Sequence, residues 1–487
     1  MNIKDAKTKI HGRLPEKVLQ IGEGNFLRAF ADWMIDRTNS AGYFNGSVVI
    51  CQPIEVGMAE QINAQNCIYT VLMRGIENKQ VVERSRVITS VSRCINPYSN
   101  YDLLLEVAKN PELKVVISNT TEAGITYRDG DKLSDRPPES YPAKMTVILY
   151  ERFKEFQGDP GKGLLILPVE LIERNGDKLK RYVLQYAADW GLEPAFTAWL
   201  ENANCFANTL VDRIVTGYPR EEIKEISATL GYEDNILVAC EPFNLWVIEA
   251  PPEWSAVLPF EKAGVNVIWT TDMTPYHARK VRILNGAHTV SVLAAYLAGH
   301  DIVLEMMEDP IFEEYLRRCI RDEVIPTISL PKKDIDDFAD AVFERFSNPF
   351  IKHRLLDISL NSVSKYKARC LPSLLDYIEK SNQLPPILSF GLAALIAFYR
   401  GTMENGAYIG ERSDGTYQIR DNPDVVLFFA ESWQHPADIV KQVLSNKEFW
   451  DQDLTQIAGL APLVEKYLNM IMNDGAAAAV KNLLESK

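Results

Sequence analysis

The chain has 487 residues, of which 46% are hydrophobic and 24% are charged. This is the composition of an ordinary globular protein, and the length predicts two or three domains. Acidic residues outnumber basic ones, so the formal net charge is −14. A surface of this sign repels phosphate backbones and anionic lipids, which argues against nucleic acid or a membrane as the main partner.

Targeting segments and metal-binding patterns are not evident in the sequence. Residues 1–7 contain no apolar stretch of the signal-peptide kind, and no run reaches the roughly 18 apolar residues that span a bilayer. The 7 cysteines include no Cys-x-x-Cys pair, which favours core thiols in a reducing compartment. The 6 histidines show no ligand spacing, so we expect no metal. The predicted location is the cytoplasm.

The first half of the chain alternates short apolar runs with helical patterns. A helix is predicted over 26–37, and a long polar loop over 127–142. The apolar runs lack the alternation of a half-exposed strand, so they predict strands buried on both faces, as in a parallel sheet covered by helices. Repetition of strand and helix predicts a doubly wound α/β domain. The strands are expected at 17–21, 47–51, 114–118 and 163–167.

A change of pattern follows the proline-containing segment 249–253. One more strand is predicted at 265–269, and from Thr274-Pro275 onward the pattern becomes mostly helical, with Pro275 suited to a first helical turn. We therefore predict a Rossmann-type α/β domain over 1–274 and a mainly α-helical domain over 275–487. Helices are expected at 309–325, 334–347, 350–380, 386–401, 423–430 and 436–445, and near the C-terminus.

Two glycines, Gly22 and Gly24, directly follow the first predicted strand. Glycines at this point let the backbone approach a pyrophosphate at the start of the next helix. Leu27 stands where a third glycine would complete the dinucleotide-binding pattern, so an ordinary strand-to-helix turn remains an alternative. Glu55, just past the second strand, could hold two ribose hydroxyls. No arginine cluster for a 2′-phosphate follows it, which favours NAD over NADP.

The segment Ser118-Asn119-Thr120-Thr121-Glu122-Ala123-Gly124 follows another buried strand. Loops at the carboxyl ends of strands line the ligand crevice of a doubly wound sheet. The side chains of Asn119 and Thr120 could therefore face a cofactor ribose. A polar loop that merely caps a helix would give the same pattern.

Lys280, Asn285 and His288 interrupt a helical segment that is otherwise apolar from Ile283 onward. Asn285 and His288 are one helical turn apart and share a face, and Lys280 precedes them in a more polar stretch. An amine close to an amide and an imidazole could reduce a carbonyl group, with the lysine exchanging the proton and the other two groups binding the developing alkoxide. A surface lysine beside a hydrogen-bonded core histidine is the alternative.

These motifs resemble those of the mannitol dehydrogenase family, the polyol-specific long-chain dehydrogenases that work without zinc. The matching patterns are Gly22-x-Gly24-x-Phe26-x-Arg28-Ala29 and Lys280-x-x-x-x-Asn285-x-x-His288, and the resemblance covers about 16–470. It implies a Rossmann-type NAD-binding domain, a helical domain, and an active site between them. The cofactor-binding residues implied are Gly22, Gly24, Asn25, Phe26, Arg28, Glu55, Asn119 and Thr120.

The resemblance also implies residue roles in catalysis. Lys280 would be the general acid in ketone reduction and the base in alcohol oxidation, Asn285 would stabilise the alkoxide, and His288 would orient the substrate oxygens. Asp212 and Arg213, in the Val-Asp-Arg-Ile segment, are expected near the substrate.

Two departures from the family pattern indicate a separate branch. Leu171 stands where other members have a second oxyanion-binding asparagine, and His277 replaces an acid three residues before the lysine. The reaction that the resemblance implies is NADH-dependent reduction of the ketone of D-tagaturonate to D-altronate, with a small-molecule uronate as the partner of a monomer or small homo-oligomer. Fructuronate reduction, a mannitol-type polyol oxidation and a non-catalytic NAD sensor are the alternatives.

A uronate carries a carboxylate, which a protein of net charge −14 must meet with fixed cations. Lys365 is the foremost candidate for contact with the substrate. Lys365 belongs to a cluster of possible partners for the carboxylate in the helical half of the chain: Arg345, Lys352, His353, Lys365 and Arg369.

Overall fold

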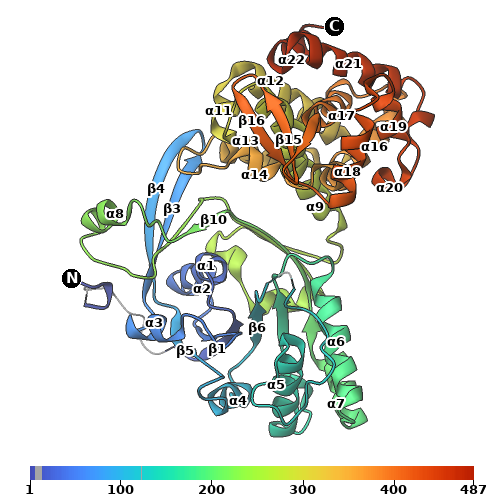
Figure 1. The fold of residues 1–487 in the computed structure, drawn as a ribbon. Helices are drawn as coiled ribbons and strands as arrows, with labels where there is room; N and C mark the ends of the chain where they lie inside the picture. The colour runs from blue at the N-terminus through green and yellow to red at the C-terminus, as the bar shows by residue number, and fades with distance from the viewer. Residues whose placement is uncertain (6–13, 122, 487) are drawn as a thin grey trace. The chain divides into compact units, whose positions relative to one another are not determined.

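The computed structural model describes residues 1–5, 14–121 and 123–486. The chain forms two compact units, Met1–Met273 and Thr274–Lys487 (Figure 1). Three features considered in the sequence lie outside the described residues: His11, the end of the N-terminal segment 1–7, and Glu122 in the loop after the third predicted strand.

Unit 1 is built on a six-stranded sheet in which every neighbouring pair is parallel. The strand order is β5-β2-β1-β6-β7-β8, so the order reverses between β1 and β6. In such sheets the ligand crevice lies at the carboxyl ends of the strands on either side of the reversal. The strands are β1 (Glu16–Ile21), β2 (Ser47–Cys51), β5 (Val91–Ile95), β6 (Val115–Ser118), β7 (Leu165–Pro168) and β8 (Cys205–Phe206).

Each strand of this sheet contributes alternate side chains to two separate hydrophobic cores. Val18 and Val48 lie in the core that includes Met34 of α2 (Ala31–Ser40), whereas Leu19 and Val49 lie in the core on the other face. Burial on both faces explains why the strands are apolar without alternation. The second core is closed by α4 (Asp102–Ala108), α5 (Tyr141–Glu155), α6 (Asn175–Asp189) and α7 (Pro194–Ala203). The predicted Rossmann-type fold is confirmed.

The helix predicted over 26–37 is interrupted. It forms as α1 (Asn25–Ala29) and α2, separated by Phe30, whose backbone departs from ideal helical angles at φ −118° and ψ −79°. Phe30 is fully buried and stacks on Phe26 with a centroid distance of 4.9 Å. The apolar periodicity is nearly the same on both sides of the break, so the sequence pattern does not reveal it.

Two further sheets of unit 1 were not predicted in full. A long hairpin of β3 (Tyr69–Glu77) and β4 (Gln80–Ile88) turns at Asn78 and Lys79, both with positive φ, and joins β10 (Val215–Gly217) and β11 (Val238–Cys240). The strand predicted at 265–269 is β13 (Val267–Thr270), paired in parallel with β12 (Leu245–Glu249). On its other side β12 pairs with β9 (Asn208–Asp212) in the antiparallel direction.

Unit 2 is mainly helical, as predicted. The chain enters through α9 (Thr274–Arg279), η5 (Lys280–Asn285) and α10 (Gly286–Leu297), which follow one another without a gap. Helix α10 packs against α17 (Pro386–Phe398), which is apolar all round because 12 of its residues are buried. Other helices lie at or near the predicted places: α12 (Pro310–Arg318), α13 (Lys332–Phe346), α16 (Leu371–Ser381), α18 (Pro423–Ser432), α19 (Ile439–Ser445), α21 (Leu460–Asp474) and α22 (Ala476–Glu485).

The sequence reading of unit 2 was wrong in two places. The helix expected over 350–380 is divided into α14 (Leu355–Ile358), α15 (Ser362–Arg369) and α16, with 350–354 outside any helix. A small antiparallel sheet of β14 (Gly401–Glu404), β15 (Ala407–Arg412) and β16 (Gly415–Ile419) was missed altogether. Its strands are short and contain glycine, and most residues of β14 and β16 are exposed, so they lack the apolar signal of the core strands.

The seven cysteines are free and buried, and in the described part of the chain no helix is long and apolar enough to cross a membrane. Burial raises the pKa of all seven thiols, for example to about 12 for Cys51. They are therefore protonated and unreactive at neutral pH, in agreement with their interpretation as core residues.

Candidate functional site

The glycine motif forms a tight turn at the carboxyl end of β1. Gly22 has φ +125°, and a Cβ atom there would lie 2.8 Å from the carbonyl oxygen of Asn119, the residue that follows β6. Only glycine fits this close approach between the loops after the two strands. The motif therefore lies at the point where the strand order reverses.

Beyond Gly22 the turn opens to solvent. Gly24 is exposed, and a Cβ atom added to it would meet no other atom within 4 Å. Asn25 is also exposed, whereas Phe26 is half-buried. The backbone at Gly24 is therefore accessible to a ligand group, as the predicted pyrophosphate site requires.

Arg28 has a different place from its neighbours in the motif because its side chain is 1% exposed. Its guanidinium donates to the carbonyl oxygens of Glu23 and Ile236 and to Oδ1 of Asn25. The ring of Tyr69 lies 5.2 Å from the guanidinium carbon. Arg28 thus fixes the shape of the glycine turn from inside unit 1 and positions Asn25.

A buried carboxyl group lies beneath the same turn. Oδ2 of Asp32 accepts hydrogen bonds from the Tyr69 hydroxyl (2.6 Å) and from the amide of Gln20 (3.4 Å), and this amide also bonds to the Gly22 carbonyl (3.0 Å). Oδ1 of Asp32 has no hydrogen-bond partner in the described residues. Burial raises the pKa of Asp32 to about 7, because the charged form is poorly solvated.

We expect Asp32 to make the protein less stable as the pH rises. The raised pKa means that the folded state holds the proton more tightly than the unfolded chain, so this stabilisation is complete at low pH and is lost through pH 7. The free energy of unfolding should fall by roughly 1.4 kcal/mol between about pH 6 and 8 from this group alone. Urea titrations of the wild type and of Asp32→Asn across this range measure the effect, and equal pH slopes in the two proteins would contradict it.

The loop after β2 carries Glu55 at the rim of a cavity. The side-chain amide of Gln52 donates to the carbonyl oxygens of Ile54 (2.8 Å) and Glu55 (2.9 Å), which fixes the loop while the Glu55 side chain stays exposed. The cavity has a volume of about 700 Å³ and is also lined by Thr120 and Lys144. Two predicted cofactor residues, Glu55 and Thr120, are thus brought to one hollow.

Glu170 anchors the loop after β6, a role that the sequence reading missed. This glutamate is 2% exposed and accepts hydrogen bonds from the Ser118 hydroxyl (3.1 Å), the Thr120 backbone N–H (3.0 Å) and the Thr120 hydroxyl (2.9 Å). Asn119, between the two, is half-buried with its backbone N–H bonded to Ile21. The position of Glu170 one residue before Leu171 was the available signal, because that segment departs from the family pattern.

Asp212 and Arg213 lie at the end of β9 and are each 5% exposed. The guanidinium of Arg213 donates to the carbonyl oxygens of Ala29 (2.7 Å) and Glu241 (3.0 Å) and lies 4.6 Å from the Trp33 ring. These contacts tie the glycine-turn helix to the antiparallel strands of unit 1. Arg213 therefore has a positioning role within this unit. Leu171, in place of the second oxyanion amide, is 64% exposed and offers no polar group.

The three proposed catalytic side chains of unit 2 lie on one unusual helix. Its central segment η5 is a π-helix, in which the N–H of Gly286 donates to the carbonyl of Val281, five residues earlier. Five residues of an α-helix are about 140° apart around the axis, at roughly 100° each. The wider π turn instead brings a residue close to the one five positions on. Lys280 therefore comes to the same side as Asn285, and His288 follows one turn later.

All three side chains are half-buried. In a regular α-helix, a spacing of five residues would not place Lys280 on the same side as Asn285. Nothing in the residue types reveals the π segment. Such segments occur frequently at functional sites, because they alter which side chains share a face.

His288 is surrounded by aromatic and cationic groups. Its ring stacks on Phe346 of α13 at a centroid distance of 4.0 Å, and His353 lies edge-on at 5.2 Å. Nδ1 of His288 is buried and has no hydrogen-bond partner in the described residues. Burial lowers the pKa of His288 well below its ordinary value, and four nearby charges lower it further: His353, Arg345, Arg369 and Lys365. The imidazole is therefore neutral, with one donor and one acceptor nitrogen.

Most of the predicted cation cluster thus gathers at one place. Four of its five members act on His288, although they come from α13, α15 and the segment between these helices. The fifth, Lys352, has an exposed side chain. His277, which replaces the family acid, is exposed on α9.

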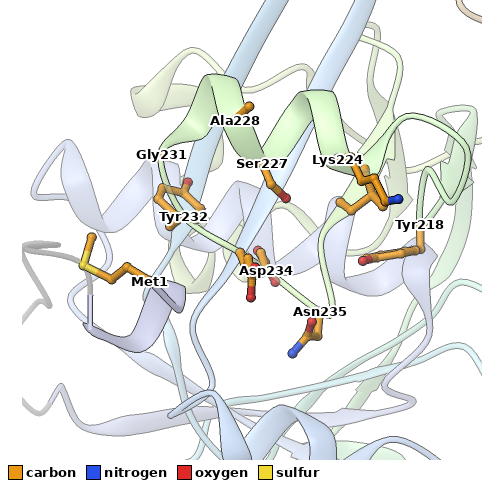
Figure 2. Close-up of a pocket in the computed structure, with 11 residues that line it drawn as sticks. Met1, Tyr218, Lys224, Ser227, Ala228, Gly231, Tyr232, Asp234 and Asn235 are labelled. Atoms are coloured by element: carbon orange, nitrogen blue, oxygen red, sulfur yellow. The ribbon is translucent and has the colours of Figure 1, made fainter.

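A second cavity, of about 550 Å³, lies beside α8 (Ile223–Leu230) (Figure 2). It is lined by the start of the chain and by the segment around Asp234, and it includes none of the predicted site residues. Asp234 accepts hydrogen bonds from Gln65 and from two backbone N–H groups, and Tyr232 is bonded to Thr70. These polar groups are therefore used within the fold. Among the described residues, no group of three His, Cys, Asp or Glu side chains could hold a metal ion.

The family of the chain follows from two matches that together span both units. The family model of the mannitol dehydrogenase Rossmann domain matches residues 16–261, and that of the mannitol dehydrogenase C-terminal domain matches residues 272–472. The chain belongs to the mannitol dehydrogenase family, which confirms the resemblance of the two motifs.

Curated relatives narrow the likeness within this family. The chain is 46% identical to the altronate oxidoreductase of Cronobacter sakazakii and 45% identical to that of Escherichia coli, in each case over 96% of this chain and 97% of the relative. The altronate oxidoreductase of Klebsiella pneumoniae is 46% identical over the same shares.

Two solved structures share the fold. Pseudomonas fluorescens mannitol 2-dehydrogenase, solved in a ternary complex with NAD and D-mannitol, has a TM-score of 0.67 at 22% identity, covering 97% of this chain and 95% of that one. D-Sorbitol dehydrogenase in substrate-free form has a TM-score of 0.78 at 22% identity, over 96% and 95% of the two chains.

Proposed function

We propose that the chain is an NAD-dependent oxidoreductase that reduces the ketone of D-tagaturonate to the alcohol of D-altronate, and the reverse. The observation that carries this proposal is the near-full-length likeness to proteins named altronate oxidoreductase, at 45–46% identity. The placement of Lys280, Asn285 and His288 on one side of a helix supports the oxidoreductase chemistry. The enzyme works on a small molecule in the cytoplasm.

The residues of unit 1 fit a dinucleotide. The exposed backbone at Gly24 has room for a pyrophosphate, and Glu55 offers a carboxylate for ribose hydroxyls at the rim of the neighbouring cavity. The proposed dinucleotide site is also bordered by Asn25, Phe26, Asn119 and Thr120. Gly22 and Arg28 determine the shape of the turn at this site. When bound, NADH supplies the hydride that reduces the ketone carbon.

The residues of unit 2 manage the proton and the developing charge. Lys280 donates a proton from Nζ to the oxygen of the ketone as that oxygen becomes an alkoxide, and takes it back in the oxidation direction. The Asn285 amide donates a hydrogen bond to the same oxygen. The neutral imidazole of His288 binds and orients a substrate hydroxyl through its unpaired Nδ1. Lys365 belongs to the proposed substrate-binding set of unit 2. Asp212 and Arg213 of unit 1 are buried, and their proposed contribution to substrate binding is to position the segments around them.

The substrate test is a comparison of ketoses with NADH under identical conditions. We expect oxidation of NADH with D-tagaturonate at a kcat/KM at least about 100-fold above that with D-fructuronate or D-fructose, because discrimination by a polar site exceeds that by shape alone. Absorbance of the nicotinamide measures the rate. A preference for D-fructuronate or D-fructose would move the enzyme to another branch of the family, and binding of NADH without any turnover would indicate a sensor.

A further inference from the structure

We propose that Arg345 and Arg369 hold the carboxylate of the substrate and make the enzyme specific for acidic ketoses. The proposal rests on the proposed reduction of a keto acid and names the groups that distinguish this acid from a neutral sugar. The juxtaposition that carries it is the placement of two arginines, from different helices, beside the imidazole of His288.

Arg369 lies at the end of α15, against the π segment. A Cβ atom on Gly286 would lie 3.3 Å from the Arg369 carbonyl oxygen, and the Cys370 thiol contacts the Gly286 carbonyl at 3.7 Å. The Arg369 guanidinium bonds to the hydroxyl of Thr289 at 3.3 Å. Since Thr289 directly follows His288, the guanidinium is held next to the proposed substrate-orienting residue.

Arg345 approaches the same imidazole from α13. It directly precedes Phe346, whose ring stacks on His288 at 4.0 Å, and its side chain is 6% exposed. Arg345 and Arg369 are both among the charges that depress the pKa of His288. The positive charges of two arginines from separate helices thus act on one ring.

Two of the cations near His288 form no ion pair with a described residue. In the part of the chain that the structure describes, neither Lys365 nor Arg369 forms an ion pair with a carboxylate, whereas Lys367 on the same helix pairs with Asp451 at 2.7 Å. Burial lowers the pKa of Arg369 and of Lys365. A desolvated cation without a counter-ion is costly, and an anionic ligand would remove that cost.

The arginines are better suited to the carboxylate than Lys365. The Lys365 ammonium already donates to the carbonyl oxygen of Ile358 at 2.8 Å, which directs one of its protons into the protein. A guanidinium presents paired donors that match the two oxygens of a carboxylate. Lys365 then adds positive charge and binds a neighbouring hydroxyl, while the arginines set the orientation of the acid.

The position along the helix agrees with the chemistry of the substrate. In a 5-keto aldonic acid, three carbons separate the ketone from the carboxylate. Asn285 and His288 are three residues apart, roughly 4.5 Å along an α-helix. This rise is comparable to the length of the four bonds between the ketone carbon and the carboxylate carbon, so a ketone bound at Asn285 would place the carboxylate near His288, where the two arginines lie.

The test compares D-tagaturonate with D-tagatose, which carries a CH₂OH group in place of the carboxylate. For Arg369→Gln and for Arg345→Gln we expect kcat/KM with D-tagaturonate to fall by about 100-fold, through KM, because a charge-assisted pair is lost. With D-tagatose the change should be less than about 3-fold. Arg369→Lys keeps the charge without the paired donors and should recover part of the loss.

Lys367→Gln is the matched control, because this residue lies on the same helix and is paired outside the site. This substitution should leave kcat/KM unchanged with both substrates. Thermal unfolding reports whether each variant is folded. Equal losses for the acid and the neutral ketose in the arginine variants would overturn the proposal, since they would indicate a structural role.

A binding measurement separates this inference from the proposed reaction. Calorimetry of D-altronate and of the neutral polyol D-altritol, with NAD present, reports recognition of the carboxylate without turnover. Selective loss of D-altronate binding in Arg369→Gln would support binding of the carboxylate by the arginines. This conclusion would hold even if the enzyme did not reduce D-tagaturonate, because failure to reduce it would refute only the proposed reaction. Equal affinities of the wild type for D-altronate and D-altritol would refute the proposal that the arginines bind the carboxylate.

Discussion

Replacing Lys280 by alanine is expected to lower the rate of ketone reduction by about 1,000-fold while leaving the affinity for NADH unchanged. Removal of a positioned general acid typically costs between about 10²- and 10⁴-fold in rate. Cofactor affinity should persist because the residues proposed to hold the dinucleotide belong to unit 1, whereas Lys280 begins the π segment of unit 2. Steady-state kinetics and fluorescence titration with NADH measure the two quantities.

Lys332→Ala supplies the control for this substitution. Lys332 is an exposed residue of α13 whose ammonium pairs with Asp336 at 2.8 Å, so its removal should change neither rate nor affinity. If Lys280→Ala kept a rate within tenfold of the wild type, the lysine could not be the proton donor. If Lys280→Ala also lost NADH binding, the lower rate would reflect a change of the fold and not the loss of a proton donor.

The second large effect is expected at Gly22. The substitution Gly22→Ala places a Cβ atom 2.8 Å from the Asn119 carbonyl oxygen at a backbone φ of +125°. A side chain in this region of the backbone costs roughly 1–3 kcal/mol, and the clash pushes apart the loops after β1 and β6. We therefore expect both a lower free energy of unfolding and a loss of NADH affinity of at least about tenfold, since 1.4 kcal/mol corresponds to a factor of ten.

Gly24→Ala separates these two effects. Gly24 has φ −63°, and an added Cβ atom meets no protein atom within 4 Å, so the stability should stay that of the wild type. The methyl group would nevertheless occupy the space proposed for the pyrophosphate, and NADH should bind more weakly. Urea unfolding and NADH titration of both variants check this pair of outcomes. Unchanged NADH affinity in Gly22→Ala and Gly24→Ala would contradict a pyrophosphate site at this turn.

Much of unit 1 could be predicted because its strands carry a strong local signal. Residues such as Val18 and Leu19 are both apolar because each faces a separate core, and this leaves an unbroken apolar run between turn residues. The break at Phe30 and the hairpin of β3 and β4 could not be predicted in the same way. The first leaves the periodicity unchanged, and β4 is largely exposed and lacks an apolar pattern.

The residues that act through others were also hidden in the sequence. Arg28 belongs to the glycine motif, but its contact with Ile236 joins chain segments that are 208 positions apart. Glu170 likewise anchors Thr120 across 50 positions of sequence. No local pattern identifies such pairs, because the contact exists only once the sheet has formed.

The residue types, the two motifs and the apolar periodicity were sufficient to identify the family, the Rossmann-type and helical halves, and the lysine, asparagine and histidine of the proposed chemistry. The sequence also showed that cations were plentiful between 345 and 369. Only the tertiary structure decided which of them gather at His288 and that a π turn brings Lys280 to the side of Asn285. The physical reason is that residue type and spacing act locally, whereas burial, charge neighbours and helix winding depend on how distant segments pack.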